Sequence, residues 1–221
     1  MSKGQVDSRS YRPTEVVAFR KTNEDFGGLS NMAPGFPLEI EQVKIRTSEA
    51  LYQACRFPHM PDVQRMIIQE SSPMTAKMLS KPYREQSRAD WEEVRIPIMR
   101  WCLRVKLLQN WRRFSELLLQ TKDLPIVEDS RKDDYWGARL DAHGRLEGRN
   151  ILGRMLMELR QQVREAPDML QEVLPLRIEN FSLYGRPLPT VTREVEPELG
   201  STDPRRRSFK TDDNAPTFSG L

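Results

Sequence analysis

The stretch IMRWCLRVKLL, residues 98–108, decides the fold class. Its apolar residues recur at the spacing of an amphipathic α-helix that turns one face toward a core. These positions are Ile98, Trp101, Cys102, Val105 and Leu108. Upstream, Asp90 can cap a helix that begins at Trp91, but Pro97 lacks a backbone donor and is predicted to interrupt or restart it.

Helical patterns continue on both sides of this stretch. Upstream, Ser48 is a suitable N-cap for a first helix, and residues 62–69 and 72–79 form two short helical patterns. Downstream, residues 114–119 predict another helix, and Asn150 is placed to cap the last one. The apolar stripe of that last helix is Leu152, Met155, Leu156, Leu159 and Val163.

Two short β-strands are predicted before the helices. Residues 16–19 favour a strand, and residues 37–46 alternate apolar and polar side chains. Residues 27–35 are rich in glycine and predict a loop between the two strands. The fold class is therefore mainly α (α+β), a compact single helical domain with a small N-terminal β element.

Composition divides the chain of 221 residues into three zones. Apolar residues make up 38% and charged residues 30%, which suggests an ordinary core with polar ends. We expect residues 1–15 to be a flexible leader and residues 16–170 to be the folded domain. Prolines recur after Ala166, so that residues 171–221 are expected to be a disordered or partner-docking tail.

Several classes of protein are disfavoured by the sequence. The net charge of +3 allows a polyanionic partner without demanding one. No apolar window is long enough for a membrane span and residues 1–14 lack an apolar signal segment, so a soluble, cytoplasmic protein is expected. Cys55 and Cys102 lack metal-binding spacing and are expected to be buried filler, while His59 and His143 have no ligand companions. No metal site is expected.

Three clusters of polar residues are candidates for chemistry. In the first, Glu49, Tyr52, Gln53 and Arg56 share one face of a helix, and a carboxylate in a first turn is stabilised by the helix dipole. Such a group can act as a base or stabilise a cation, although a plain solvated face gives the same spacing.

The second and third clusters lie in the C-terminal half of the domain. Residues 127–137 place Trp136 and Gly137 after acidic residues, where the indole either stacks on a base or sugar or anchors the loop. Residues 144–153 place glycines just before a predicted helix N-terminus. Such a segment can bind a phosphate, but an ordinary turn has the same sequence.

Segments in a fixed order along residues 17–165 carry a resemblance to a known family. They include GLSN (28–31), TSEALYQA (47–54), SPMTAK (72–77), DWEEV (90–94), DYWG (134–137) and GRNILGRMLMELR (148–160). Their order and spacing resemble the NADAR family, a group of small, mostly helical N-glycosidases. Where many members read TSEHYFQAQK, this chain has Ala50 and Leu51, and its loop at 139–149 is longer and adds arginines.

The resemblance implies a reaction and a set of site residues. Glu49 becomes the essential carboxylate, which stabilises an oxocarbenium-like ribose C1 and orients the attacking water, and Asp134 shares this work or holds a ribose hydroxyl. No cofactor is implied, because water is the co-reactant. The implied substrate-binding residues are Arg20, Gly28, Ser30, Asn31, Tyr52, Gln53, Lys77, Trp91, Trp136, Gly137, Gly148 and Asn150.

These residues are expected to divide the substrate between them. Trp91 and Trp136 sandwich the base or sugar, and Asn31 positions the ribose. The phosphates are expected at Arg20, at Lys77 and at the turn formed by residues 148–150.

The resemblance implies two kinds of substrate. One is ADP-ribose attached to guanine in nucleic acid, which would make the protein an antitoxin with a cognate ADP-ribosyltransferase toxin as partner. The other is a phosphoribosyl-aminopyrimidine intermediate of riboflavin synthesis. Ala50, Leu51 and the arginines of residues 139–149 favour the first. A non-catalytic module that binds NAD or ADP-ribose is the alternative from another class.

Overall fold

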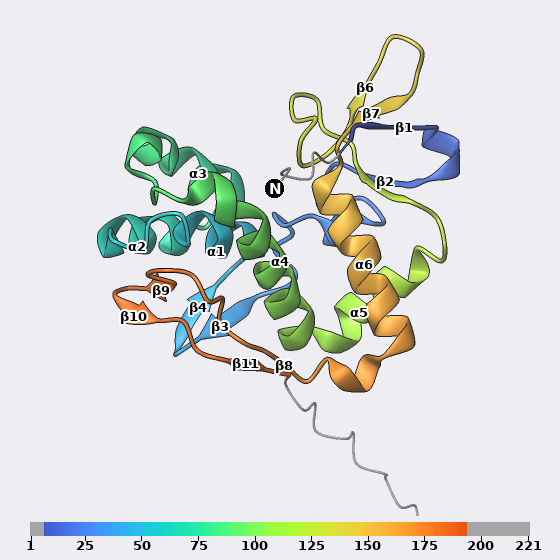
Figure 1. Ribbon diagram of the computed structural model, residues 1–221. Coiled ribbons are helices and arrows are strands. Elements are labelled where there is room, and N and C mark those ends of the chain that lie inside the picture. Colours follow the sequence, from blue (N-terminus) through green and yellow to red (C-terminus); the bar gives the residue numbers. More distant parts are fainter. Residues whose placement is uncertain (1–6, 194–221) are drawn as a thin grey trace, which may run out of the picture.

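The computed structural model describes residues 7–193, which form a helical body with short strands at its edges (Figure 1). The α-helices are α1 (Ser48–Ala54), α2 (Pro61–Gln69), α3 (Pro73–Leu79), α4 (Trp91–Gln109), α5 (Trp111–Gln120) and α6 (Ile151–Glu165). Short 3-10 turns are η1 (Pro13–Glu15), η2 (Gly27–Leu29), η3 (Lys81–Gln86) and η4 (Pro167–Met169). The mainly α (α+β) prediction is confirmed.

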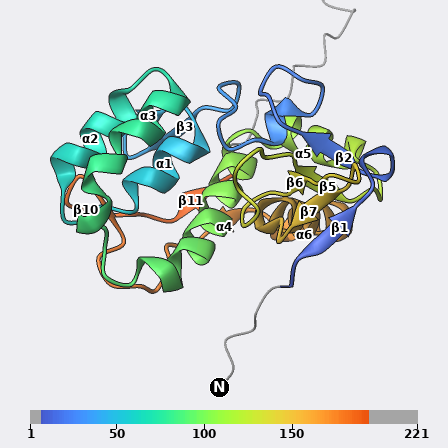
Figure 2. The same ribbon diagram turned by 90° about the horizontal axis from the view of Figure 1, so that it is seen from above.

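Helix α4 is the central element of the fold. Figure 2 shows it between α1, α2 and α3 on one side and α5, α6 and strands β5–β7 on the other. The predicted apolar stripe from Ile98 to Leu108 is buried against these neighbours. The interruption predicted at Pro97 is wrong, because this residue lies on the exposed face and its ring leaves the buried side of the helix intact.

Two helix boundaries differ from those predicted. Thr47, not Ser48, is the N-cap of α1, and its Oγ1 accepts a hydrogen bond of 3.2 Å from the Ala50 amide. Helix α5 begins at Trp111, directly after α4, instead of at residue 114.

The strands are short and come from distant parts of the chain. Strand β2 (Val17–Phe19) pairs in parallel with β5 (Ile126–Glu128), which was not predicted as a strand. The alternating residues 37–46 form two strands, β3 (Leu38–Ile40) and β4 (Val43–Ile45). Their turn needs two left-handed residues, and Glu41 and Gln42 supply them with φ of 47° and 68°.

Both ends of the described chain are ordered where flexibility was expected. Strand β1 (Arg9–Tyr11) pairs with β7 (Leu146–Gly148), which also pairs with β6 (Arg139–Leu140). Strands β8 (Glu172–Val173) and β11 (Val191–Thr192) pair with each other, as do β9 (Ser182–Leu183) and β10 (Arg186–Pro187).

The predicted domain boundaries are therefore wrong at both ends. Residues 171–193 return along the α1–α2–α4 side of the molecule (Figure 1), where Phe181, Leu183 and Leu188 are buried. Prolines between these apolar side chains set an extended path but do not prevent burial. The rest of the expected leader and tail, residues 1–6 and 194–221, lies outside the described residues. Among residues 7–193, no helix is long and apolar enough to cross a membrane.

Candidate active site

A cleft of about 390 Å³ lies between α1 and α3 on one side and α4 and the loop after β5 on the other. Many of its walls are polar, and charged side chains of both signs reach it. The charged lining residues are Glu49, Arg56, Lys77, Arg84, Glu92, Arg95, Glu128 and Asp133. The sequence segments that suggested chemistry around residues 49 and 136 therefore meet in one place.

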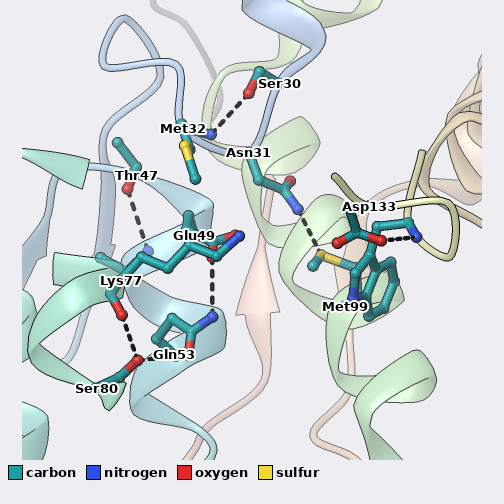
Figure 3. A network of polar contacts seen from close by, with 12 residues as sticks. Ser30, Asn31, Met32, Thr47, Glu49, Gln53, Lys77, Ser80, Met99 and Asp133 are labelled. Atoms are coloured by element: carbon teal, nitrogen blue, oxygen red, sulfur yellow. Dashed lines mark hydrogen bonds and ion pairs between the residues drawn. The ribbon is translucent and has the colours of Figure 1, made fainter. Parts of the chain in front are cut away.

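Glu49 stands in the first turn of α1, where the Thr47 cap fixes the start of the helix. Its side chain is nearly buried, and Oε1 accepts a hydrogen bond of 3.0 Å from Gln53 Nε2. Lys77 Nζ lies 4.0 Å from the same oxygen, and Figure 3 shows both groups converging on it. No donor among residues 7–193 bonds to Oε2, so this oxygen can face a substrate.

The loop around Asn31 fixes the backbone of Glu49 by hydrogen bonds. The Asn31 carbonyl accepts hydrogen bonds from the Glu49 amide at 3.0 Å and from Ser48 Oγ at 3.2 Å. The Asn31 amide is directed to Met99 Sδ, 2.6 Å away (Figure 3). Ser30 and Asn31 thus line the cleft as predicted, although Asn31 is bonded to protein groups there.

A buried lysine fixes this loop. Lys106 Nζ donates to the Gly28 carbonyl at 2.7 Å and to the Ser30 carbonyl at 2.9 Å. The rings of Phe36 and Phe114 lie 4.6 and 4.4 Å from the ammonium, which compensates part of its lost hydration. Burial lowers the pKa of Lys106 to about 7.

Glu128 is a second carboxylate of the cleft that the sequence did not single out. It stands at the end of β5, half-buried, and burial together with the negative charge of Glu49 raises its pKa to about 7. The positive charge of Lys77 acts in the opposite direction. The sequence signal that could have identified Glu128 is its position directly after two apolar residues, Ile126 and Val127, which are buried in the structure.

Asn150 places Glu128 and does not contact the cleft. Its Nδ2 donates to the Ile126 carbonyl at 2.8 Å, and its Oδ1 accepts from the Glu128 amide at 3.2 Å. Asn150 is fully buried and left-handed, with φ of 49°. Asn150 is the N-cap residue of α6 as predicted, but its side chain bonds to β5 instead of capping the helix, and the predicted phosphate role is wrong for the same reason.

The aspartate that reaches the cleft is Asp133, not Asp134. Asp133 Oδ1 accepts hydrogen bonds from the amides of Tyr135 at 3.0 Å and Trp136 at 2.9 Å, which fixes the loop below the indole. The Asp134 side chain is 64% exposed and lies 3.7 Å from Arg139. The expected catalytic placement of Asp134 is wrong, because the tight turn at Asp133 directs the next side chain outward.

Aromatic rings form a continuous wall of the cleft. The Tyr52 ring lies 5.1 Å from Trp91 and 5.7 Å from Trp136. Both tryptophans line the cleft as predicted, but Tyr52 contacts each of them, so the three rings make one wall. Burial, and then the charge of Glu49, raises the pKa of Tyr52 far above its usual value, so its hydroxyl is a donor and not a base.

The helix N-terminus predicted to hold phosphate is already occupied. The amides of Asn150, Ile151 and Leu152 donate to the carbonyls of residues 137, 135 and 136 at 3.0, 3.1 and 3.0 Å. A Cβ at Gly148 would lie 2.4 Å from the Gly137 carbonyl oxygen. Both glycines therefore serve close packing of two backbones, and the predicted phosphate role of this turn is wrong.

Two further predicted residues, Arg20 and Gly28, lie outside the cleft. Arg20 lies 3.7 Å from Asp129 and is not among the lining residues. Gly28 packs against Phe36, where a Cβ would approach within 2.8 Å. Lys77 lines the cleft, as do Arg56, which the first candidate cluster included, and two arginines that the sequence did not single out, Arg84 and Arg95.

The two residues that distinguish this chain from the common family pattern also lie elsewhere. Ala50 is 3% exposed and Leu51 is 0% exposed, and both belong to the core that packs α1 onto its neighbours. They do not line the cleft, because they occupy the face of α1 opposite Glu49. They therefore carry no argument about the substrate.

The fold and the cleft together define a class: a mainly helical domain that presents two glutamates beside an aromatic wall. The sequence profile of the NADAR domain matches residues 18–164, and the chain belongs to this family.

Two curated relatives and one solved structure are similar to the chain. "Riboflavin biosynthesis protein VVA0006" of Vibrio vulnificus is 33% identical over 185 residues, covering 81% of this chain and 48% of that protein. The chain thus spans about half the length of that relative. "N-glycosidase YbiA" of Escherichia coli is 34% identical over 151 residues, covering 67% of this chain and 88% of that protein. The solved structure of YbiA aligns with a TM-score of 0.57 over 67% of this chain and 84% of that one, at 34% identity.

Proposed function

We propose that this chain is an N-glycosidase that hydrolyses the bond between ribose C1 and a nitrogen base. The observation that carries the proposal is the pair Glu49 and Glu128, which meet beside one aromatic wall in different environments. Paired carboxylates of unlike environment are the usual acid and base of glycoside hydrolysis. The printed names of relatives such as N-glycosidase YbiA support the same reaction class.

The proposed chemistry assigns one step to each carboxylate. The C1–N bond breaks as positive charge develops on the ribose, and the Glu49 carboxylate stabilises that charge. Water adds to C1 and gives a proton to Glu49, while protonated Glu128 gives its proton to the departing base nitrogen. The C1–N bond is thereby replaced by a C1–O bond, and exchange of protons with solvent restores both groups.

The favoured substrate is ADP-ribose attached to guanine in DNA, with the protein acting as antitoxin to a cognate ADP-ribosyltransferase. The supporting feature is the β6–β7 hairpin and the loop before it, which carry exposed basic residues: Arg131 and Lys132, between the cleft residues Ser130 and Asp133, and Arg139 on β6. Exposed basic side chains on this hairpin and loop suit the phosphates of a nucleic acid. With Ala50 and Leu51 buried, this is the remaining residue-level support for the DNA-linked substrate.

The second candidate substrate is a phosphoribosyl-aminopyrimidine of riboflavin synthesis. It is favoured by the printed name of the Vibrio relative and requires the same carboxylates. This substrate is small, so it would not contact the exposed basic residues Arg131, Lys132 and Arg139.

A direct comparison of substrates tests the proposal. The full chain is incubated with guanine-ADP-ribosylated DNA and, separately, with the riboflavin precursors, and release of ADP-ribose or ribose phosphate is followed. Release from the DNA alone supports the favoured substrate, and release from the precursors alone transfers the activity to the second. Release from neither, by protein that is folded, overturns the N-glycosidase proposal.

A further inference from the structure

Two arginines, Arg56 and Arg84, line the cleft that contains Glu49. Arg56 follows the C-terminus of α1, and Arg84 belongs to η3. The pKa of Arg56 is lowered first by burial and then by the positive charge of Arg84. Such a pair is unfavourable unless an anion lies between its members.

Arg56 is held in place on two sides. Its Nε donates to Ser87 Oγ at 2.6 Å, and its guanidinium carbon lies 4.9 Å above the Trp91 ring. Within residues 7–193, no hydrogen bond joins its terminal nitrogens or the Arg84 guanidinium to another side chain. These donors are therefore positioned by the fold and available to a ligand.

Glu92, the carboxylate that acts most on Arg56, does not neutralise the two arginines. Glu92 lines the same cleft and opposes the fall in the Arg56 pKa, but less than Arg84 promotes it. The Glu92 carboxylate is 3.0 Å from Arg95 Nε and is thus paired with another cation. The part of the cleft at Arg56 and Arg84 remains positively charged.

The spacing along α1 relates this pair to the carboxylate. Arg56 follows Glu49 by seven residues, a rise of about 10 Å along a helix. Arg56 lies two residues beyond the last residue of α1, and its side chain and that of Glu49 both reach the same cleft. A ribose with C1 at Glu49 can extend its C5 substituent toward Arg56 across this distance.

We propose that Arg56 and Arg84, backed by Trp91, form the subsite for the phosphate on ribose C5. This inference rests on the proposed function, because Glu49 is taken to mark the position of C1. It replaces the α6 turn, whose amides are occupied, as the place where the substrate phosphate is bound. A fork of guanidinium donors matches phosphate oxygens in geometry as well as in charge.

The experiment measures binding without turnover. Calorimetry with the Glu49→Gln protein compares ribose 5-phosphate, inorganic pyrophosphate and unphosphorylated ribose. Arg56→Gln or Arg84→Gln, added to that background, is expected to weaken ribose 5-phosphate binding about tenfold, and pyrophosphate binding is expected to fall in parallel. Binding of ribose itself is expected to be unchanged.

Arg112→Gln is the matched control, because Arg112 is exposed on α5 and lies outside the cleft. It is expected to bind like the parent protein. Arg84 is exposed in η3, so its variant keeps the test available if Arg56→Gln does not fold.

Two outcomes overturn the subsite: affinity for ribose 5-phosphate within twofold of the parent in both arginine variants, or no phosphate-dependent binding by the parent. Failure of the proposed function has a different result. In that case no N-glycoside is hydrolysed by the natural protein, while phosphate affinity still depends on the two arginines.

Discussion

Two helix N-termini in this protein are both predicted from the sequence to belong to the site, and they differ in the structure. The first turn of α1 presents Glu49 to the cleft, and its position is fixed by the Thr47 cap and the Asn31 carbonyl. The first turn of α6 donates its amides to the loop at residues 135–137 and is closed to ligands. The first amides are bonded within the protein at both N-termini, so the comparison teaches that α1 contributes to the site through the charged side chain in its first turn and not through free backbone donors.

The largest expected effect is at the first turn of α1. Glu49→Gln keeps the shape and the contact with Gln53 but removes the negative charge, so turnover should fall about a thousandfold or more. Initial rates and ligand binding are measured together, and binding is expected to persist. Glu116→Gln on the exposed face of α5 is the control. Unchanged turnover in Glu49→Gln would remove the carboxylate role and leave a non-catalytic nucleotide-binding module.

The next largest effect tests whether Glu128, and not Glu49, donates the proton to the leaving base. Glu128 has its pKa raised to about 7, so its protonated, proton-donating form is present below that pH and is lost above it. The rate is therefore expected to fall as pH rises through about 7. Glu128→Gln should lower kcat about a hundredfold and remove this limb of the pH profile. A profile that the substitution leaves unchanged would contradict the assignment of Glu128 as the acid.

The closed terminus should respond in stability and not in ligand binding. Asn150→Ala leaves the Ile126 carbonyl and the Glu128 amide without partners, which should lower the free energy of unfolding by about 3 kcal/mol in urea titrations. Asn180→Ala is the matched control, since Asn180 has a similar φ of 48° but is exposed. A loss of ribose 5-phosphate affinity in folded Asn150→Ala, with stability unchanged, would reverse the interpretation.

The smallest effect concerns the neighbouring aspartates of the loop. Asp134→Asn should leave kcat within about twofold of the natural protein, since this carboxylate is exposed and its pair with Arg139 lies at the surface. Asp133→Ala removes the acceptor for the Tyr135 and Trp136 amides and should lower kcat about fivefold by loosening the indole. Initial rates of both variants decide which aspartate matters, and a larger loss in Asp134→Asn would contradict the geometry.

Much of the helical framework could be predicted because its information is local. The apolar period around Ile98 and Val105 gave α4, and the stripe from Leu152 to Val163 gave α6, since burial of one face imposes that spacing. Pro97 misled because its cost depends on which face of the helix it occupies. The strand at β5 was missed because three residues are too few to establish a period.

Within the cleft, prediction succeeded for residues on a single helix and failed across segments. Glu49, Tyr52 and Gln53 share a face of α1, which their spacing states directly. The approach of Glu128 to Glu49 joins β5 to α1, and the effect of Arg84 on the pKa of Arg56 joins η3 to the end of α1. Contacts between distant segments leave no mark in local spacing.

The sequence by itself determined the helices, the position of one carboxylate in a first turn and the place of Trp136 after an acidic loop, because each follows from neighbours a few residues away. Tertiary structure decided which glutamate joins Glu49, which aspartate faces the cleft, and which helix N-terminus presents a charged side chain to it. It also decided that residues 171–193 are part of the fold. The physical reason is that donors, charges and apolar surfaces are satisfied by whatever packs against them, and packing brings together residues that are far apart in the chain.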